Sequence, residues 1–296
     1  MVIQAQLKHE ELEFTNSHVK SVSVISTGSA EVHREHFRGT HKPALWWIFV
    51  SRQRILVPIN VFIIEHRDGL VLFDTGLDRA ILTDPGYYPD SVTSFFVHHI
   101  FKLHMRPEDT LTEKLKLAGY SVADVKKAVI SHLHFDHIGG INEIPQADLY
   151  VSEREWEHMR EPYSQRKGFY KQHIDIPGAN WHRIAFEPTE DKSLLPFTHS
   201  YDLMGDGSLV LLSTPGHTPG SLSMLVRRDG AKPLLLVGDM AYGEKYFEHN
   251  QLPAIGDKKQ LRASFEKVHA LKRGLPGLVV LPSHDVGATE ELRLAV

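Results

Sequence analysis

Five apolar segments of this chain each lead into an aspartate or a histidine, and this pattern limits the folds that the chain can adopt. The segments are LVLF before Asp74, AVIS before His132, LVLLSTPG before His217, PLLLVG before Asp239 and GLVVLPS before His284. Continuous apolar runs of this length are typical of strands that are buried on both faces. Polar side chains just beyond such strands meet at one rim of the sheets, where rigid strands fix their geometry. The pattern therefore predicts layered β-sheets with a polar site at one edge.

The densest part of the pattern is the stretch SHLHFDHIGG, residues 131–140. Alternate side chains of an extended segment point the same way, so His132 and His134 are expected on one side. A turn at Asp136 and His137 then presents a second face. Two faces of metal-binding side chains suit two adjacent metal ions better than one.

The candidate ligands divide into two sets. Zinc and similar ions take about four ligands from histidine and carboxylate side chains. The first predicted set is His132, His134 and His217, and the second is Asp136, His137 and His284. Asp239 remains, and its carboxylate is predicted to bridge two ions that lie about 3.5–4 Å apart. We expect Asp74 to have a structural role instead, accepting hydrogen bonds from backbone amides in a tight turn.

The composition excludes several classes of function. The chain has 296 residues, a formal net charge of −4 and no cysteine. Disulfides, catalytic thiolates and zinc sites with a cysteine ligand are thereby excluded, and no basic run predicts nucleic-acid binding. The N-terminal stretch MVIQAQLKHEELEF lacks the apolar core of an export signal, and no apolar run reaches the roughly 20 residues of a membrane helix. We therefore expect a cytoplasmic protein that binds neither nucleic acid nor membranes.

Turn and cap residues place several elements. Residues 59–65 are expected to form a strand that starts after Pro58 and pairs with residues 70–73 through the turn RDG. Asp229 and Gly230 predict a second hairpin turn. Ser152 with Glu155 three residues later resembles a capping box.

Two further segments are read from their residue patterns. Asp257 is expected to cap a helix whose apolar stripe runs from Leu261 to Leu271 and that ends at Gly274. Residues 83–109 are rich in aromatic side chains and fit no strand of the main sheet. We interpret this segment as an excursion that forms a lid or a contact surface, with an ordinary core helix as the alternative.

These motifs, in this order, resemble those of the metallo-β-lactamase superfamily. The matching features are HxHxDH at 132–137, TPGHTPGS around His217, GD at Asp239, PSHD at His284 and FDTG at 73–76. The resemblance spans residues 73–284 and implies an α/β fold, a four-layer αβ/βα sandwich of two mixed β-sheets flanked by helices. Because the predicted ligands are spread over most of the chain, a single domain over residues 1–296 is the economical interpretation.

The details favour one branch of the superfamily. Class B β-lactamases with a cysteine ligand are excluded, flavodiiron proteins carry a glutamate at the position of His134, and the basic arm of tRNA-processing nucleases is missing. SHLHFDHIGG looks like the motif of the N-acyl-homoserine lactone lactonases, and Tyr242 in GDMAY is similar to the tyrosine that those enzymes aim at the substrate carbonyl. Related organophosphate hydrolases share the ligands and give the alternative, a phosphotriester or other ester hydrolase. A non-catalytic metal-binding or partner-binding protein that kept the fold is a third hypothesis, and the complete ligand set argues against it.

The resemblance implies a mechanism and its cofactors. A hydroxide that bridges two divalent ions, zinc or else cobalt, manganese or iron, would attack the lactone carbonyl. Tyr242 would donate a hydrogen bond to the substrate, and Asp136 would pass a proton to the leaving alkoxide. The candidates for contact with an acyl tail are Trp46, Trp47, Phe95, Phe96 and Phe101. The apolar stretch FFVHHIF within residues 83–109 makes a homodimer a further expectation.

Overall fold

The computed structural model describes residues 18–295. Residues 1–14, on which the prediction of no export signal rests, lie outside the described residues. Within the described part of the chain, no helix is both long enough and apolar enough to cross a membrane. The cytoplasmic location stays a prediction.

The first half of the chain builds a mixed sheet of seven strands in the order β4-β1-β2-β3-β5-β6-β7. The strands are β1 (Val19–His33), β2 (Arg54–His66), β3 (Gly69–Phe73), β4 (Phe101–His104), β5 (Val125–Val129), β6 (Asp148–Ser152) and β7 (Asn180–Ile184). Strands β3, β5, β6 and β7 run parallel to one another, whereas β1, β2 and β4 pair antiparallel. The carboxyl ends of β3 and β5 therefore lie at the same edge.

The second half builds a six-stranded sheet in the order β13-β12-β11-β10-β9-β8. Its strands are β8 (Glu187–Pro188), β9 (His199–Asp202), β10 (Leu209–Ser213), β11 (Leu222–Val226), β12 (Leu234–Gly238) and β13 (Val279–Pro282). Strand β11 pairs antiparallel with both β10 and β12, and β12 pairs parallel with β13. Strands β10, β12 and β13 consequently end at one edge of this sheet.

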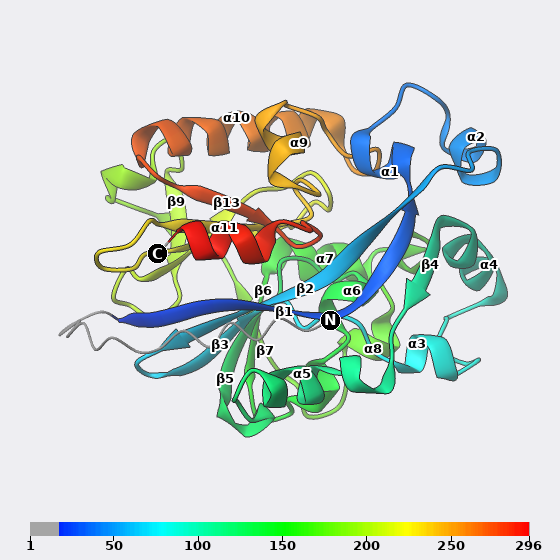
Figure 1. The fold of residues 1–296 in the computed structure, drawn as a ribbon, viewed down its shortest axis with the longest axis horizontal. Helices are drawn as coiled ribbons and strands as arrows, with labels where there is room; N and C mark the ends of the chain where they lie inside the picture. The colour runs from blue at the N-terminus through cyan, green and yellow to red at the C-terminus, as the bar shows by residue number, and fades with distance from the viewer. Residues whose placement is uncertain (1–17, 296) are drawn as a thin grey trace.

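The helices of the described residues are α1 (Arg34–Arg38), α2 (Ala44–Phe49), α3 (Ala80–Thr83), α4 (Ser91–Ile100), α5 (Leu111–Leu117), α6 (Phe135–Ile138), α7 (Glu153–Arg160), α8 (Lys171–Ile174), α9 (Glu244–Glu248), α10 (Lys258–Gly274) and α11 (Ala288–Leu294). Helices α5 and α7 pack on the outer face of the seven-stranded sheet, and α10 packs on the outer face of the six-stranded sheet (Figure 1). The predicted αβ/βα sandwich of two mixed sheets is confirmed.

Alternation along the strands explains the layers. In β2, Phe62 and Ile64 point into the core between the sheets, whereas Val61 and Ile63 point outward to the core under α5 and α7. In the second sheet, the outward-facing side chains of β10 and β12 pack against Phe265 and its neighbours on α10. Side chains of both sheets meet in one core between them. This shared core supports our proposal that residues 1–296 form a single domain.

Two expectations about local structure need correction. The strand expected at 59–65 begins at Arg54, so Pro58 lies inside β2. A proline is tolerated there because the register of β1 against β2 shifts between Ser26 and Ser29, next to the residue that faces Pro58. The segment 83–109 was expected to hold no strand of the main sheet, but its residues 101–104 form β4, which pairs with β1 at the sheet edge.

Candidate metal centre

All seven predicted ligands converge at the edge where the strands of both sheets end. His132 follows β5, His217 follows β10, Asp239 comes directly after β12, and His284 follows β13. His134 precedes α6, and that helix carries Asp136 and His137. The prediction that these side chains lie together at one edge of the sheets is confirmed. Metal binding by the same side chains is a proposal.

The first predicted set forms a close cluster of imidazole nitrogens. His134 Nδ1 lies 3.0 Å from His132 Nε2 and 3.0 Å from His217 Nε2. One ring nitrogen offers either one lone pair or one proton, so His134 Nδ1 cannot satisfy both neighbours fully. Nitrogens bound at about 2.0–2.1 Å to one tetrahedral zinc ion lie about 3.3 Å apart. The cluster thus matches the spacing of three ligands around one ion.

The second set faces the first across Asp239. The Oδ1 atom of Asp239 lies 3.2 Å from His284 Nε2 and 3.4 Å from His137 Nε2. Its Oδ2 atom lies 3.5 Å from His217 Nε2, which belongs to the first set. Asp136 completes the second group, with Oδ2 at 3.5 Å from His284 Nε2. Asp239 therefore offers one oxygen to each set, as a bridging carboxylate would.

Burial and protonation also fit a divalent cation. Burial, together with the neighbouring imidazoles, lowers the pKa of His134 and of His217 to about 3 and that of His132 well below its ordinary value. These three rings are therefore neutral near pH 7, which is the form that binds metal. Among residues 18–295, His137 Nε2 and Asp239 Oδ1 are buried without a hydrogen-bond partner. Buried polar groups without a partner are costly, and a bound metal ion would supply a partner for both atoms.

Supporting residues fix the orientation of the second set. His284 Nδ1 donates to the carbonyl of Pro58 at 2.8 Å, which leaves Nε2 directed at the centre. Burial alone would lower the pKa of His137, but Asp74, Asp239 and Asp136 outweigh it and raise that pKa well above its ordinary value. Burial would also lower the pKa of His284, but the charge and hydrogen bond of Asp239 outweigh it and raise that pKa. The centre of this group is thus electronegative and suited to a cation.

The two glycines that follow the histidine motif allow a close packing of loops. A Cβ on Gly139 would lie 2.0 Å from the backbone nitrogen of Asp78, and a Cβ on Gly140 would lie 2.6 Å from the carbonyl oxygen of Thr75. The amide of Gly139 also donates to Gly76 O at 2.7 Å. These contacts press the ligand-bearing turn against the loop that follows β3, so only glycine fits at both positions.

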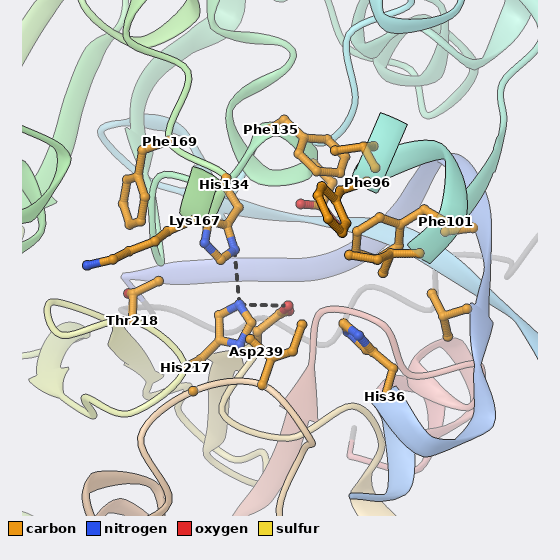
Figure 2. Close-up of a pocket in the computed structure, with 18 of the residues that line it drawn as sticks. His36, Phe96, Phe101, His134, Phe135, Lys167, Phe169, His217, Thr218 and Asp239 are labelled. Carbon is orange, nitrogen blue, oxygen red and sulfur yellow. Dashed lines mark hydrogen bonds and ion pairs between the residues drawn. The ribbon is translucent and has the colours of Figure 1, made fainter. Parts of the chain in front are cut away.

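A cavity of about 680 Å³ opens beside the seven side chains. Figure 2 shows His134, His217 and Asp239 at its centre, with Phe96, Phe101 and Phe135 to one side and Lys167, Phe169 and Thr218 to the other. Of the side chains proposed for an acyl tail, Phe96 and Phe101 line this cavity. Trp47 is instead buried against His33 and His36, whereas Trp46 and Phe95 are partly exposed and lie outside the lining.

Tyr242 also lines this cavity, and it brings in a residue that the sequence motifs miss. The phenol is buried, and its oxygen lies 3.1 Å from His36 Nε2. Burial, reinforced by the charges of Asp239 and Asp136, raises the pKa of Tyr242 well above its ordinary value, so the hydroxyl keeps its proton. His36 belongs to none of the motifs found in the sequence, and only the fold brings it to the site.

Comparison with known proteins gives the context of this site. The family model of the metallo-beta-lactamase superfamily matches residues 54–284. The chain is 33% identical over 198 residues to the N-acyl homoserine lactonase AttM of Rhizobium radiobacter, a match that covers 67% of this chain and 70% of the relative.

Two solved structures share the fold. One is an N-acyl homoserine lactone hydrolase with the product N-hexanoyl-L-homoserine bound at the catalytic metal center, with a TM-score of 0.73, 23% identity, and 94% of this chain and 97% of that chain covered. The other is AidC, a dizinc quorum-quenching lactonase, with a TM-score of 0.61, 18% identity, and 92% of each chain covered.

Proposed function

Because the chain belongs to the metallo-beta-lactamase superfamily, we propose that it is a metal-dependent hydrolase that opens the lactone ring of N-acyl homoserine lactones. One observation carries the proposal: two sets of side chains that could hold metal ions, joined by Asp239, lie beside a cavity that Tyr242 and an apolar wall also line. The similarity to a curated lactonase over 70% of its length supports the choice of substrate.

We propose two bound divalent ions. The first would be held by His132, His134 and His217, the second by Asp136, His137 and His284, and Asp239 would bridge them. Neutral imidazoles and carboxylates suit zinc, with cobalt, manganese and iron as alternatives. When bound, two such ions supply a water molecule with a lowered pKa and a positive charge for the carbonyl oxygen under attack.

The chain's own residues would orient the substrate and move its proton. Tyr242 would donate a hydrogen bond to the oxygen of the lactone carbonyl or of the neighbouring amide. The side chain of Asp136 is 15% exposed against 5% for Asp239, so Asp136 is the ligand carboxylate that is more open to the cavity and able to pass a proton to the leaving alkoxide.

The shape of the cavity supports an acylated substrate. Its volume lies within the range of roughly 300–1,000 Å³ that is usual for small-molecule sites. The side chains of Phe96, Val97 and Ile100 on α4, with Phe101 beyond it, form an apolar wall. We propose that the acyl tail packs along this wall, with its amide near the polar centre.

Assembly is a separate proposal. Leu45 and Phe49 on α2 and Phe95 on α4 are exposed apolar side chains, and Phe49 packs against Phe95. We propose that this surface joins two copies of the chain in a homodimer. Native mass spectrometry of the wild type and of a Phe49→Ser variant tests it.

The test of the proposed function compares substrates on one metal-loaded preparation. Homoserine lactones of several acyl lengths are expected to release acid on ring opening, and a paraoxon-like triester is expected to turn over poorly. Good turnover of the triester without lactone hydrolysis would favour the phosphotriesterase alternative. A Tyr242→Phe variant is expected to lose about 100-fold or more in kcat for lactones, in the range of other single oxyanion donors.

A further inference from the structure

The aromatic ring of His36 is held against Tyr242 in a fixed orientation. The two rings are stacked, with centroids 5.3 Å apart and an interplanar angle of 24°. The His36 ring also packs in T-shaped arrangements with Trp47 and with Phe101. The carbonyl oxygen of His36 accepts a hydrogen bond from the amide of Ala254 at 2.9 Å, which ties α1 to the loop before α10. These contacts place the His36 ring beside the phenol of Tyr242.

His36 lines the same cavity as the proposed metal centre (Figure 2). Among the hydrogen bonds of residues 18–295, the hydroxyl of Tyr242 takes part in one, with His36 Nε2 at 3.1 Å. The direction of this one bond decides where the hydrogen of the phenol points. If Tyr242 donates to His36, the phenolic hydrogen is already used in that bond and cannot bind a substrate oxygen. If His36 donates to Tyr242, the hydrogen is left for another acceptor.

The other nitrogen of His36 indicates the direction. Both partners are uncharged near pH 7, because burial lowers the pKa of His36 to about 3 and raises that of Tyr242. The neutral ring carries one proton, on Nδ1 or on Nε2. Within the described part of the chain, Nδ1 is buried without a partner. A proton there would make a buried, unpaired N–H, and such donors are rarer in proteins than unpaired acceptors.

We propose that His36 is a positioning residue whose Nε2–H donates to Tyr242 Oη and so directs the phenolic hydrogen into the cavity, toward a carbonyl oxygen of the substrate. The consequence for catalysis rests on the proposed lactonase function, whereas the tautomer of His36 does not. In the opposite tautomer, a substrate oxygen would have to break the bond between Tyr242 and His36 before it could be bound.

The tautomer can be measured without any substrate. In the metal-loaded protein labelled with ¹⁵N-histidine, long-range ¹⁵N–¹H correlation distinguishes a protonated Nε2 from a protonated Nδ1, and a His36→Gln variant identifies the resonance by its absence. We expect the proton on Nε2. A proton on Nδ1 would overturn the proposal, whether or not the protein hydrolyses lactones.

Kinetics test the consequence. His36→Phe keeps an aromatic ring but removes the donor, so kcat for a lactone is expected to fall about 10-fold to 100-fold, with bound metal and KM little changed. His36→Gln restores an N–H donor and is expected to recover part of the loss. In the double variant with Tyr242→Phe, the His36 substitution should add no further loss.

Two kinetic outcomes contradict the proposal. Equal losses from His36→Phe in the presence and absence of the Tyr242 hydroxyl would show that His36 acts through packing alone, and an unchanged kcat would show that it does not act on the reaction. If the wild type cleaves no lactone, the proposed function fails while the tautomer measurement still decides the role of His36.

Discussion

The carboxylate of Asp74 and the imidazole of His137 are joined by a hydrogen bond, with Asp74 Oδ2 at 2.8 Å from His137 Nδ1. Asp74 also accepts bonds from the amide and the hydroxyl of Ser131 and from the hydroxyl of Ser283. The sequence analysis expected Asp74 to accept backbone amides in a tight turn, whereas the amide that it accepts belongs to Ser131, 57 positions later. Because Nδ1 of His137 is taken, its Nε2 faces the proposed metal centre.

Replacing Asp74 with asparagine is expected to weaken metal binding. The amide cannot match a carboxylate that accepts from Ser131, Ser283 and His137 at once, so the ring of His137 loses its fixed orientation. Zinc affinity should fall about 10-fold to 100-fold, measured by competition with a chromophoric chelator. Asp229→Asn, in an exposed turn, is the matched control and should leave the affinity unchanged. Equal affinities for both variants would contradict the assigned role.

A second buried carboxylate joins the two ligand-bearing loops. Glu155 accepts from the amide of Leu133 at 3.0 Å, from the hydroxyl of Thr218 at 2.7 Å and from the amide of Gly220 at 3.0 Å. Leu133 lies between two predicted ligands and Thr218 follows a third. The sequence pattern predicted a capping box, and Ser152 does cap the helix, but the side chain of Glu155 serves these loops instead.

Glu155 is expected to make stability depend on pH. Burial raises its pKa from 4.5 to about 7, so between these values the folded state binds more protons than the unfolded state. Its contribution to the free energy of unfolding therefore falls as the pH rises from 4.5 through 7, by about 3 kcal/mol in all.

Glu155→Gln removes this titration. In urea unfolding of the metal-free protein, the stability advantage of the wild type over the variant should shrink between pH 5 and pH 8. The histidine ligands titrate in both proteins and cancel in the difference. An advantage that is constant or grows with pH would contradict the prediction.

Neighbouring phenylalanines on α4 offer a matched test of the acyl pocket. Phe96 lines the cavity, whereas Phe95 is 51% exposed and lies outside the lining. Phe96→Ala should raise KM for a decanoyl homoserine lactone about fivefold to tenfold, because apolar contact with the tail is lost. Phe95→Ala should leave KM unchanged. A butanoyl substrate, with a shorter tail, should distinguish the two variants less.

The strand-end pattern predicted layered sheets with a polar site at one edge because the pattern is local. His132, His217, Asp239 and His284 each follow an apolar run, and strands that share a direction end at one edge. The partners of these ligands could not be predicted in the same way. His36 reaches Tyr242 across 206 positions of sequence and Asp74 reaches His137 across 63, and neither spacing repeats a motif.

The segment 83–109 shows the same limit. Its short strand β4 carries four residues, FKLH, whose alternation is too brief to separate from the preceding helix. Pairing with β1 decides its conformation, and that partner lies about 70 positions earlier. Tertiary packing also decides which aromatic residues can contact an acyl tail. Trp47 is buried among histidine rings, whereas Phe96 lines the cavity.

Metal binding should stabilise the fold. An ion that binds only the folded state raises the free energy of unfolding by about 2.7 kcal/mol when its free concentration is 100 times its dissociation constant. Zinc should therefore raise the midpoint of thermal unfolding, and a chelator should reverse this and abolish hydrolysis. His217→Ala, which removes a proposed ligand of the first ion, should show a smaller rise. If zinc raised the unfolding midpoint equally in the wild type and in His217→Ala, zinc would bind at a site that does not include His217.

Anomalous diffraction at the zinc edge, from crystals grown with zinc, tests the central claim most directly. We expect two peaks about 3.5–4 Å apart, one among His132, His134 and His217 and the other among Asp136, His137 and His284, with Asp239 in contact with both. The absence of peaks at this strand edge, or a single peak that leaves one of the two sets without metal, would contradict the account.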